Sequence, residues 1–78
     1  PGSAEERTYV RELSRALNAF LATEAALDRK IFVSRCFYCE TTAQTAEKLG
    51  LTQGQVKVRL HRCRERLRKY LRSQEFDL

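Results

Sequence analysis

The sequence has little of what breaks helices and none of what marks a membrane protein. It contains one proline and three glycines in 78 residues, which argues against a disordered chain or a turn-rich β fold. No stretch approaches the roughly 18 apolar residues of a membrane span, and no secretory signal pattern opens the chain. Ala, Leu, Arg and Glu dominate, so we expect one small all-α domain in the cytoplasm, without membrane contact.

Three cysteines, an odd number without an export signal, predict free thiols in a reducing compartment. Cys36 and Cys39 have CxxC spacing, which is compatible with a zinc site, a redox pair or two small buried hydrophobes near a helix end. Only Cys63 and His61 could complete a zinc site, and on one helix they face about 200° apart. A thioredoxin-like pair would need a βαβ unit, which is not visible. We therefore expect buried structural cysteines, with no metal and no other cofactor.

The positive charge is concentrated in one segment. Residues 57–72 carry eight Lys or Arg and one Glu, a net charge of +7, whereas the whole chain carries +5, so the remainder carries −2. A solvated helix face usually mixes both signs. Glu65 stands alone among the cations, and their mutual repulsion is relieved when a polyanion neutralises them. A nucleic acid is therefore the expected partner, and a merely soluble basic helix is the alternative.

Four helices are expected from their start and stop signals. A Ser or Thr stands at each expected N-cap, and three of the four have Glu or Gln three residues later, which is capping-box spacing. Gly50 is the expected left-handed stop of the third helix. We treat Pro1-Gly2-Ser3 as a tag remnant and residues 4–78 as a single domain. The expected helices span about 4–22, 23–38, 42–49 and 52–72, with Ser3, Thr23, Thr41 and Thr52 as their caps.

The last two expected helices, about 42–72, form a helix-turn-helix without a wing. Only Gly50-Leu51-Thr52 separates them, and Leu51 and Val56 stand where a hydrophobic staple would close. One apolar stripe follows the last helix, made of Val56, Leu60, Cys63, Leu67 and Tyr70 or Leu71. A short turn before a basic helix is the arrangement that enters the DNA major groove; an ordinary helical corner is the alternative. No catalytic triad, carboxylate pair or glycine-rich phosphate loop is present, so we expect no enzyme.

Three segments at fixed spacing, residues 28–35, 41–52 and 55–67, closely resemble domain 4 of bacterial RNA polymerase sigma factors, nearest to the extracytoplasmic-function group. The resemblance implies a bacterial cytoplasmic domain, monomeric when alone, that binds the −35 element of double-stranded promoter DNA. It also implies docking on the β flap of core RNA polymerase and an apolar surface that anti-sigma factors cover. Thr45 departs from the usual Ile or Val, and its extra hydroxyl predicts weaker packing of the third helix.

Helix geometry ranks the DNA-contacting residues. At about 100° per residue, Gly54, Val58, His61 and Glu65 point away from the apolar stripe. Base reading falls to Gln53, Gln55, Val58 and Arg62, because Gln pairs with adenine, Arg with guanine and an apolar side chain covers a thymine methyl. Phosphate contacts fall to Thr52 with the first-turn amides, and to Lys57, Arg59 and Arg64. The family resemblance adds Arg35. The remaining cations, Arg66, Arg68, Lys69 and Arg72, would extend the DNA field or serve a protein partner.

Two other functions stay open at this point. A dimeric helix-turn-helix response-regulator output domain would add a dimerisation helix after the recognition helix, and the sequence ends almost where that helix does. A basic helical module that docks on an acidic protein would bind no duplex. The residues of the first helix, Leu13, Leu17, Phe20 and Leu21, would either pack within the domain or contribute to a partner surface.

Overall fold

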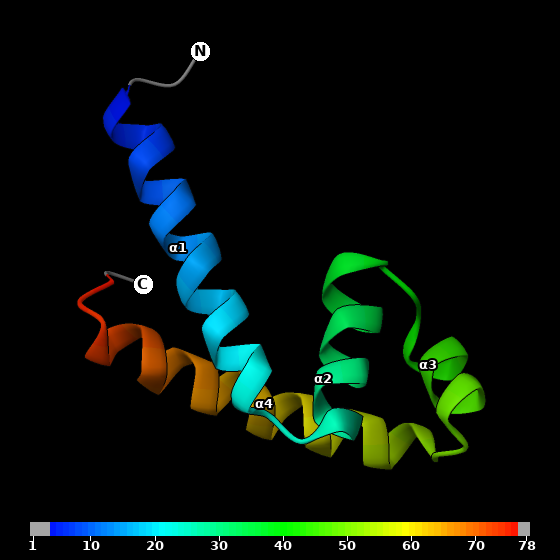
Figure 1. Ribbon diagram of the computed structural model, residues 1–78. Coiled ribbons are helices and arrows are strands. Elements are labelled where there is room, and N and C mark those ends of the chain that lie inside the picture. Colours follow the sequence, from blue (N-terminus) through cyan, green and yellow to red (C-terminus); the bar gives the residue numbers. More distant parts are fainter. Residues whose placement is uncertain (1–3, 77–78) are drawn as a thin grey trace.

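The computed structural model describes residues 4–76, and in that part of the chain it contains four α-helices and no strand. The helices are α1 (Ala4–Thr23), α2 (Ala26–Phe32), α3 (Thr42–Leu49) and α4 (Gln53–Ser73), and a π-helical segment, η1 (Val33–Phe37), continues α2 (Figure 1). The expected all-α, four-helix class is confirmed. No helix within residues 4–76 is long and apolar enough to cross a membrane. The expected cap at Ser3 and the tag remnant before Ala4 lie outside the described residues.

The second helix differs from the expectation at both ends. It begins at Ala26 rather than after Thr23, and its N-cap, Ala25, makes no side-chain hydrogen bond. The Thr23 hydroxyl donates instead to the Phe20 carbonyl oxygen of its own helix, at 2.7 Å. The Arg29 guanidinium binds the carbonyl oxygens of Leu21 and Glu24, each at 3.2 Å, and so ties the end of α1 to α2. Thr23 was therefore wrong as a cap, because its hydroxyl closes α1 instead.

The expected continuous helix to about Tyr38 ends as a π-helix. The Tyr38 amide donates to the Val33 carbonyl five residues earlier, at 3.1 Å, and the Glu40 amide reaches back to Ser34 at 3.0 Å. Cys36 and Cys39 lie on this wider corner and are both exposed, whereas Cys63 on α4 is buried. The expectation that Cys36 and Cys39 are buried was therefore wrong: the corner turns them to solvent.

The core gathers where the end of α1 meets α2, α3 and α4. Its buried members lie on all four helices, and they are Phe20, Leu21, Ile31, Phe32, Ala46, Val56, Leu60 and Cys63. The stripe expected on α4 is confirmed, with Leu67 and Tyr70 partly buried against this core and Leu71 buried. Thr45 is fully buried, and its hydroxyl oxygen has no hydrogen-bond partner among residues 4–76. Burial of a hydroxyl without a hydrogen-bond partner lowers the stability of the fold. The sequence predicts weaker packing here because of this hydroxyl.

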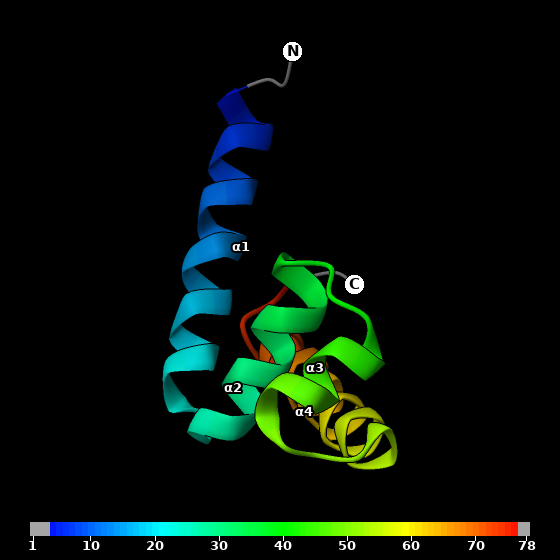
Figure 2. The same cartoon turned by 90° about the vertical axis from the view of Figure 1, so that its right-hand side faces the viewer.

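Helix α1 leaves the rest of the domain at its N-terminal half, which projects beyond the other helices (Figures 1 and 2). Its C-terminal half packs through Phe20 and Leu21, and the Phe20 ring lies 5.7 Å from that of Tyr70 on α4. Leu13 and Leu17 are half-buried, whereas Val10 is exposed. The apolar residues of α1 thus pack within the domain near Thr23, and less so toward Ala4.

Candidate nucleic-acid interface

Two capping boxes fix the starts of α3 and α4. The Gln44 amide donates to the Thr41 hydroxyl at 3.0 Å, and the Thr41 amide donates to the Gln44 side-chain oxygen at 2.8 Å. The same reciprocal pair joins Thr52 and Gln55, at 3.1 and 2.9 Å. Gly50 between them has φ of +69°, the left-handed conformation that glycine adopts most easily. Both capping boxes and the glycine stop are confirmed, and together they set the angle between the two helices.

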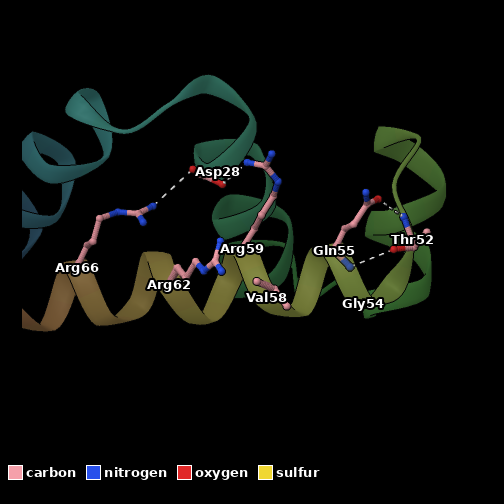
Figure 3. Close-up of a pocket in the computed structure, with 8 residues that line it drawn as sticks. All are labelled: Asp28, Thr52, Gly54, Gln55, Val58, Arg59, Arg62 and Arg66. Carbon is pink, nitrogen blue, oxygen red and sulfur yellow. Dashed lines mark hydrogen bonds and ion pairs between the residues drawn. The ribbon is translucent and has the colours of Figure 1, made fainter.

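The polar face of α4 borders an open hollow of about 510 Å³ between this helix and the start of α2 (Figure 3). Val56 is buried beneath the helix, whereas the Val58 side chain is 48% exposed on the side of the hollow. Eight residues line the hollow: Asp28, Thr52, Gly54, Gln55, Val58, Arg59, Arg62 and Arg66. The capped N-terminus of α4 thus opens onto the same surface as its outward face.

The structure brings five of the expected DNA-contacting residues to this hollow and leaves four elsewhere. Those at the hollow are Thr52, Gln55, Val58, Arg59 and Arg62. Gln53 and Lys57 are exposed on the first two turns of α4 but do not line it. Arg64 points to η1, where its guanidinium lies 3.7 Å from the Cys36 sulfur. Arg35 is half-buried and donates to the Glu40 carbonyl oxygen.

Thr52 and Gln55 are not equally free to bind a ligand. The Gln55 side-chain oxygen accepts the Thr52 amide at 2.9 Å, so pairing this side chain with adenine through both of its polar atoms would compete with the cap. The Thr52 oxygen accepts the Gln55 amide at 3.1 Å, and its hydroxyl proton remains available to a phosphate. The first-turn amides of Gln53 and Gly54 have no intrahelical acceptor, as at any helix start. This end of α4 is therefore suited to an anion.

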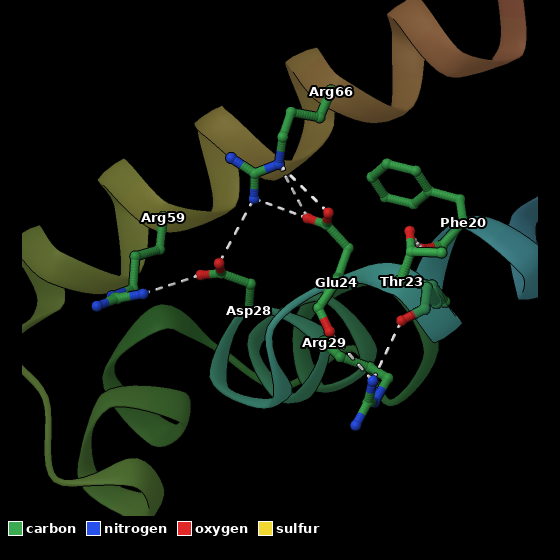
Figure 4. A network of polar contacts seen from close by, with 8 residues as sticks. Phe20, Thr23, Glu24, Asp28, Arg29, Arg59 and Arg66 are labelled. Carbon is green, nitrogen blue, oxygen red and sulfur yellow. Dashed lines mark hydrogen bonds and ion pairs between the residues drawn. The ribbon is translucent and has the colours of Figure 1, made fainter.

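Two carboxylates that the sequence analysis did not single out hold the arginines of α4. Asp28 contacts Arg59 at 3.1 Å and Arg66 at 3.5 Å, and Glu24 contacts Arg66 at 2.7 Å (Figure 4). The hydrogen bonds that the Arg66 guanidinium donates to the Glu24 carboxylate are the main reason that the pKa of Arg66 is raised. These partners lie 31 to 42 residues away in the sequence, so no local pattern reveals them. Arg66 therefore serves first to link α4 to the turn between α1 and α2 and to the start of α2.

Glu65 also has a partner, since its carboxylate lies 2.7 Å from the Arg68 guanidinium. Mutual repulsion in the basic segment is thus smaller than its sequence suggests, because three of its arginines meet carboxylates. Arg62 differs from them. It lines the hollow, is exposed, and makes no ion pair or hydrogen bond with any side chain in residues 4–76. A guanidinium that lines an open hollow and pairs with no carboxylate of the described residues is free to bind an incoming group.

Cys63 and His61 lie on different sides of α4, as their spacing predicts. Cys63 is buried and His61 is exposed. Burial, aided by the neighbouring Glu24 carboxylate, raises the pKa of the Cys63 thiol to about 12. Cys63 therefore stays protonated and unreactive at neutral pH. Within residues 4–76, no three His, Cys, Asp or Glu side chains are grouped closely enough to hold a metal ion.

The family model for sigma-70 region 4 matches residues 25–67, which is more than half of the chain. The chain belongs to the sigma-70 region 4 family. The matched segment contains α3, α4 as far as Leu67, and the residues that line the hollow, and it leaves α1 outside. The resemblance to domain 4 of sigma factors is thereby confirmed. A search of curated proteins finds no match.

Membership in this family indicates that the partner of this interface is promoter DNA. Sigma-70 region 4 is a DNA-binding helix-turn-helix domain that recognises the −35 promoter element in transcription initiation and acts with RNA polymerase. In this region 4 domain, the two helices of the motif are α3 and α4. A recognition helix presents its N-terminal turns and outward face to the groove. The N-terminus of α4 is the capped start at Thr52, and its outward face carries Val58 and Arg62.

Proposed function

We propose that α4 reads the −35 element with Val58 and Arg62, and that Gln53 at the helix tip contributes a further base contact. The proposal is carried by the exposure of Val58 at the hollow, beside Arg62, which pairs with no side chain in residues 4–76. Arg62 suits the two acceptors of guanine, and Val58 suits a thymine methyl. Gln55 holds the helix start in place and adds its amide N–H groups, rather than a full adenine pair.

The phosphate contacts surround this reading face. Thr52 and the first-turn amides would bind one backbone phosphate, and Arg59 would bind another by exchanging Asp28 for it. Lys57 and Arg64 lie on the side of α4 away from the hollow, where they would meet the opposite backbone. Arg35 would reach a phosphate only with the part of its guanidinium that does not bind Glu40. Backbone contacts of this kind position the protein without selecting a sequence.

A comparison of two arginine substitutions tests this division of roles. The reduced protein and its variants are titrated with a pool of duplexes that carry a randomised central segment, and bound duplexes are sequenced. Arg62→Ala is expected to relax the preference at one or two base pairs, since one bidentate contact discriminates by about 1–3 kcal/mol. Arg59→Ala is expected to weaken all duplexes alike and to lower the salt slope by about one. Identical behaviour of the two variants would contradict the assignment.

Affinity in isolation is expected to be low. Contacts dominated by charge give dissociation constants of about 10⁻⁴–10⁻⁶ M for non-specific DNA. Docking on the β flap of RNA polymerase, which we also propose, would raise the effective concentration of the domain at the promoter. Titration with a purified β-flap fragment should give a one-to-one complex, and an absence of binding would contradict flap docking alone. Sedimentation of the free domain should show a monomer, because a dimer would favour an output domain of the response-regulator kind.

We assign the domain to an extracytoplasmic-function sigma factor of the bacterial cytoplasm, on the resemblance of residues 28–35 and 41–67. The expected context is a second domain that reads the −10 element and an anti-sigma factor that covers apolar surface. Sequencing the genomic region that encodes Ala4 and the residues before it tests this assignment. A coding region for a −10-reading domain would support it, and a response-regulator receiver domain there would overturn it.

A further inference from the structure

The corner formed by η1 and the residues that follow it carries two exposed thiols that the DNA-binding role does not use. We propose that Cys36 and Cys39 form a redox-active dithiol, which low-molecular-weight disulfides such as oxidised glutathione convert into an intramolecular disulfide. The proposal rests on this corner and on Arg64, and it stands whether or not α4 reads bases as proposed above. In a reducing compartment such a bond is transient, which is the usual behaviour of redox-sensing disulfides.

Both sulfurs are accessible and the third is not. Cys36 and Cys39 are exposed, whereas Cys63 is buried with its pKa raised to about 12. Accessible thiols that stand near a second, resolving cysteine are the ones that oxidise reversibly. The chain therefore offers two reactive thiols on one corner and a third that serves as an internal reference.

The backbone of the corner suits a disulfide between these residues. Tyr38 has φ of −91° and ψ of −4°, the values found at the third position of a type I turn, and Phe37 before it is helical. The first and fourth α-carbons of such a turn lie within about 7 Å. Disulfides join α-carbons that are about 4.4–6.8 Å apart, so little backbone movement is needed.

Cys39 occupies a backbone position that a residue with a Cβ rarely takes. Its φ is +54°, in the left-handed region where helices usually end on glycine or asparagine. A side chain there costs about 1–2 kcal/mol. The exposed Cys39 gains little packing in return. Packing therefore does not explain the cysteine at this position.

Arg64 of α4 reaches across to this corner. Its guanidinium donates to the Cys36 sulfur at 3.7 Å, and no carboxylate among residues 4–76 pairs with Arg64. Reactive protein cysteines are found open to solvent beside arginine or lysine. Cys36 is therefore the attacking sulfur and Cys39 the resolving one, and Arg64 is the positioning residue for the first step.

The reaction has two exchange steps. Cys36 loses its proton to water and attacks one sulfur of oxidised glutathione, so that the glutathione disulfide breaks, a mixed disulfide forms and one glutathione leaves and takes up a proton. Cys39 then loses its proton and attacks the Cys36 sulfur, which releases the second glutathione. The two protein thiols are oxidised by two electrons to one disulfide. The reagent is reduced to two thiols, which carry the two protons.

Thiol counting and mass measurement test the proposal. The reduced full chain is incubated with oxidised glutathione at neutral pH, with dithiothreitol in a parallel tube to show that the reagent is active. We expect the native protein to lose both accessible thiols, the denatured protein to retain one, and the mass to fall by two hydrogen atoms. The Cys39→Ser variant should instead stop at a stable glutathione adduct on Cys36.

The role of Arg64 is tested by rate. Arg64→Ala should slow the first exchange severalfold, whereas Arg68→Ala, which removes an equal charge from α4 beside Glu65, should leave the rate unchanged. Three results would overturn the proposal: persistence of both thiols, a stable glutathione adduct on the unmodified protein, or a disulfide-linked dimer. Equal rates for the two arginine variants would show that Arg64 has no part in the first exchange step.

Discussion

The Asp28 carboxylate of α2 lies 3.1 Å from the Arg59 guanidinium of α4, at the hollow that both residues line. This contact puts a negative charge on the surface that we propose to face DNA. It holds the Arg59 guanidinium against the start of α2 (Figure 3). The pair is partly exposed and contributes at most about 1 kcal/mol to stability. Its larger effect is expected on binding, because in the contact proposed above a phosphate replaces Asp28 at Arg59.

Removal of that charge should therefore tighten DNA binding. Asp28→Asn is expected to raise the affinity for every duplex severalfold and to increase the salt slope by about one, since Arg59 gains a phosphate at no cost. Stability should fall by less than about 1 kcal/mol. Fluorescence titration at several salt concentrations measures both. Glu12→Gln on α1, outside the matched segment, makes the same change in net charge and should have little effect. Equal or weaker binding by Asp28→Asn would contradict the exchange.

Gly54 provides a test of how closely the DNA backbone approaches. A Cβ at this position would meet nothing nearer than the Thr52 hydroxyl oxygen, 3.9 Å away, among the described residues. Gly54→Ala should therefore stabilise the helix by about 0.5–1 kcal/mol in thermal unfolding. It should weaken binding to all duplexes if a phosphate approaches the amides here. Stabilisation together with unchanged DNA affinity would show that the DNA backbone does not approach Gly54.

Gly50 is the matched control for that substitution. Its φ of +69° makes any side chain strained, although the surrounding space is open. Gly50→Ala should destabilise the fold by about 1 kcal/mol, the opposite sign to Gly54→Ala.

The buried hydroxyl of Thr45 marks a place where the domain can be stabilised. Its oxygen has no partner among residues 4–76 although the side chain is fully buried. Thr45→Val keeps the shape and removes the unpaired group, so the unfolding free energy should rise by about 1 kcal/mol. Thr45→Ser keeps the hydroxyl, removes a methyl group and should lower it by a similar amount. Urea unfolding of the three proteins measures this; a destabilised valine variant would indicate a partner for the hydroxyl.

The raised pKa of Cys63 predicts that the fold loses stability at alkaline pH. Its pKa is raised to about 12 in the folded protein, from an ordinary value near 9.0. Below pH 9 both states keep the proton, and above it only the unfolded thiol ionises. Stability should then fall by up to about 1.4 kcal/mol per pH unit as pH rises toward 12. Urea unfolding at pH 8, 9 and 10 should show this fall in the unfolding free energy. The Cys63→Ala variant should lack the part of the fall that comes from this thiol.

Sequence patterns predicted the features that depend on residues close together in the chain. The caps at Thr41 and Thr52 and the stop at Gly50 were predictable because each depends on residues within four positions. Thr23 has the same chemistry but serves as the end of α1, since Arg29 already ties the two helices together. The partners of Arg59 and Arg66 lie on another helix, beyond the reach of periodicity. The exposure of Cys36 followed from the π-helical corner, for which the sequence carries no start or stop signal.

Both helices of the motif begin with reciprocal caps that are complete without a ligand. The free protein therefore spends no conformational entropy on folding its reading surface when it meets a promoter. The speed of that encounter should follow diffusion and ionic strength, and temperature should change it little beyond the viscosity of water. A domain built in this way can test many sites in quick succession and leave most of them as quickly.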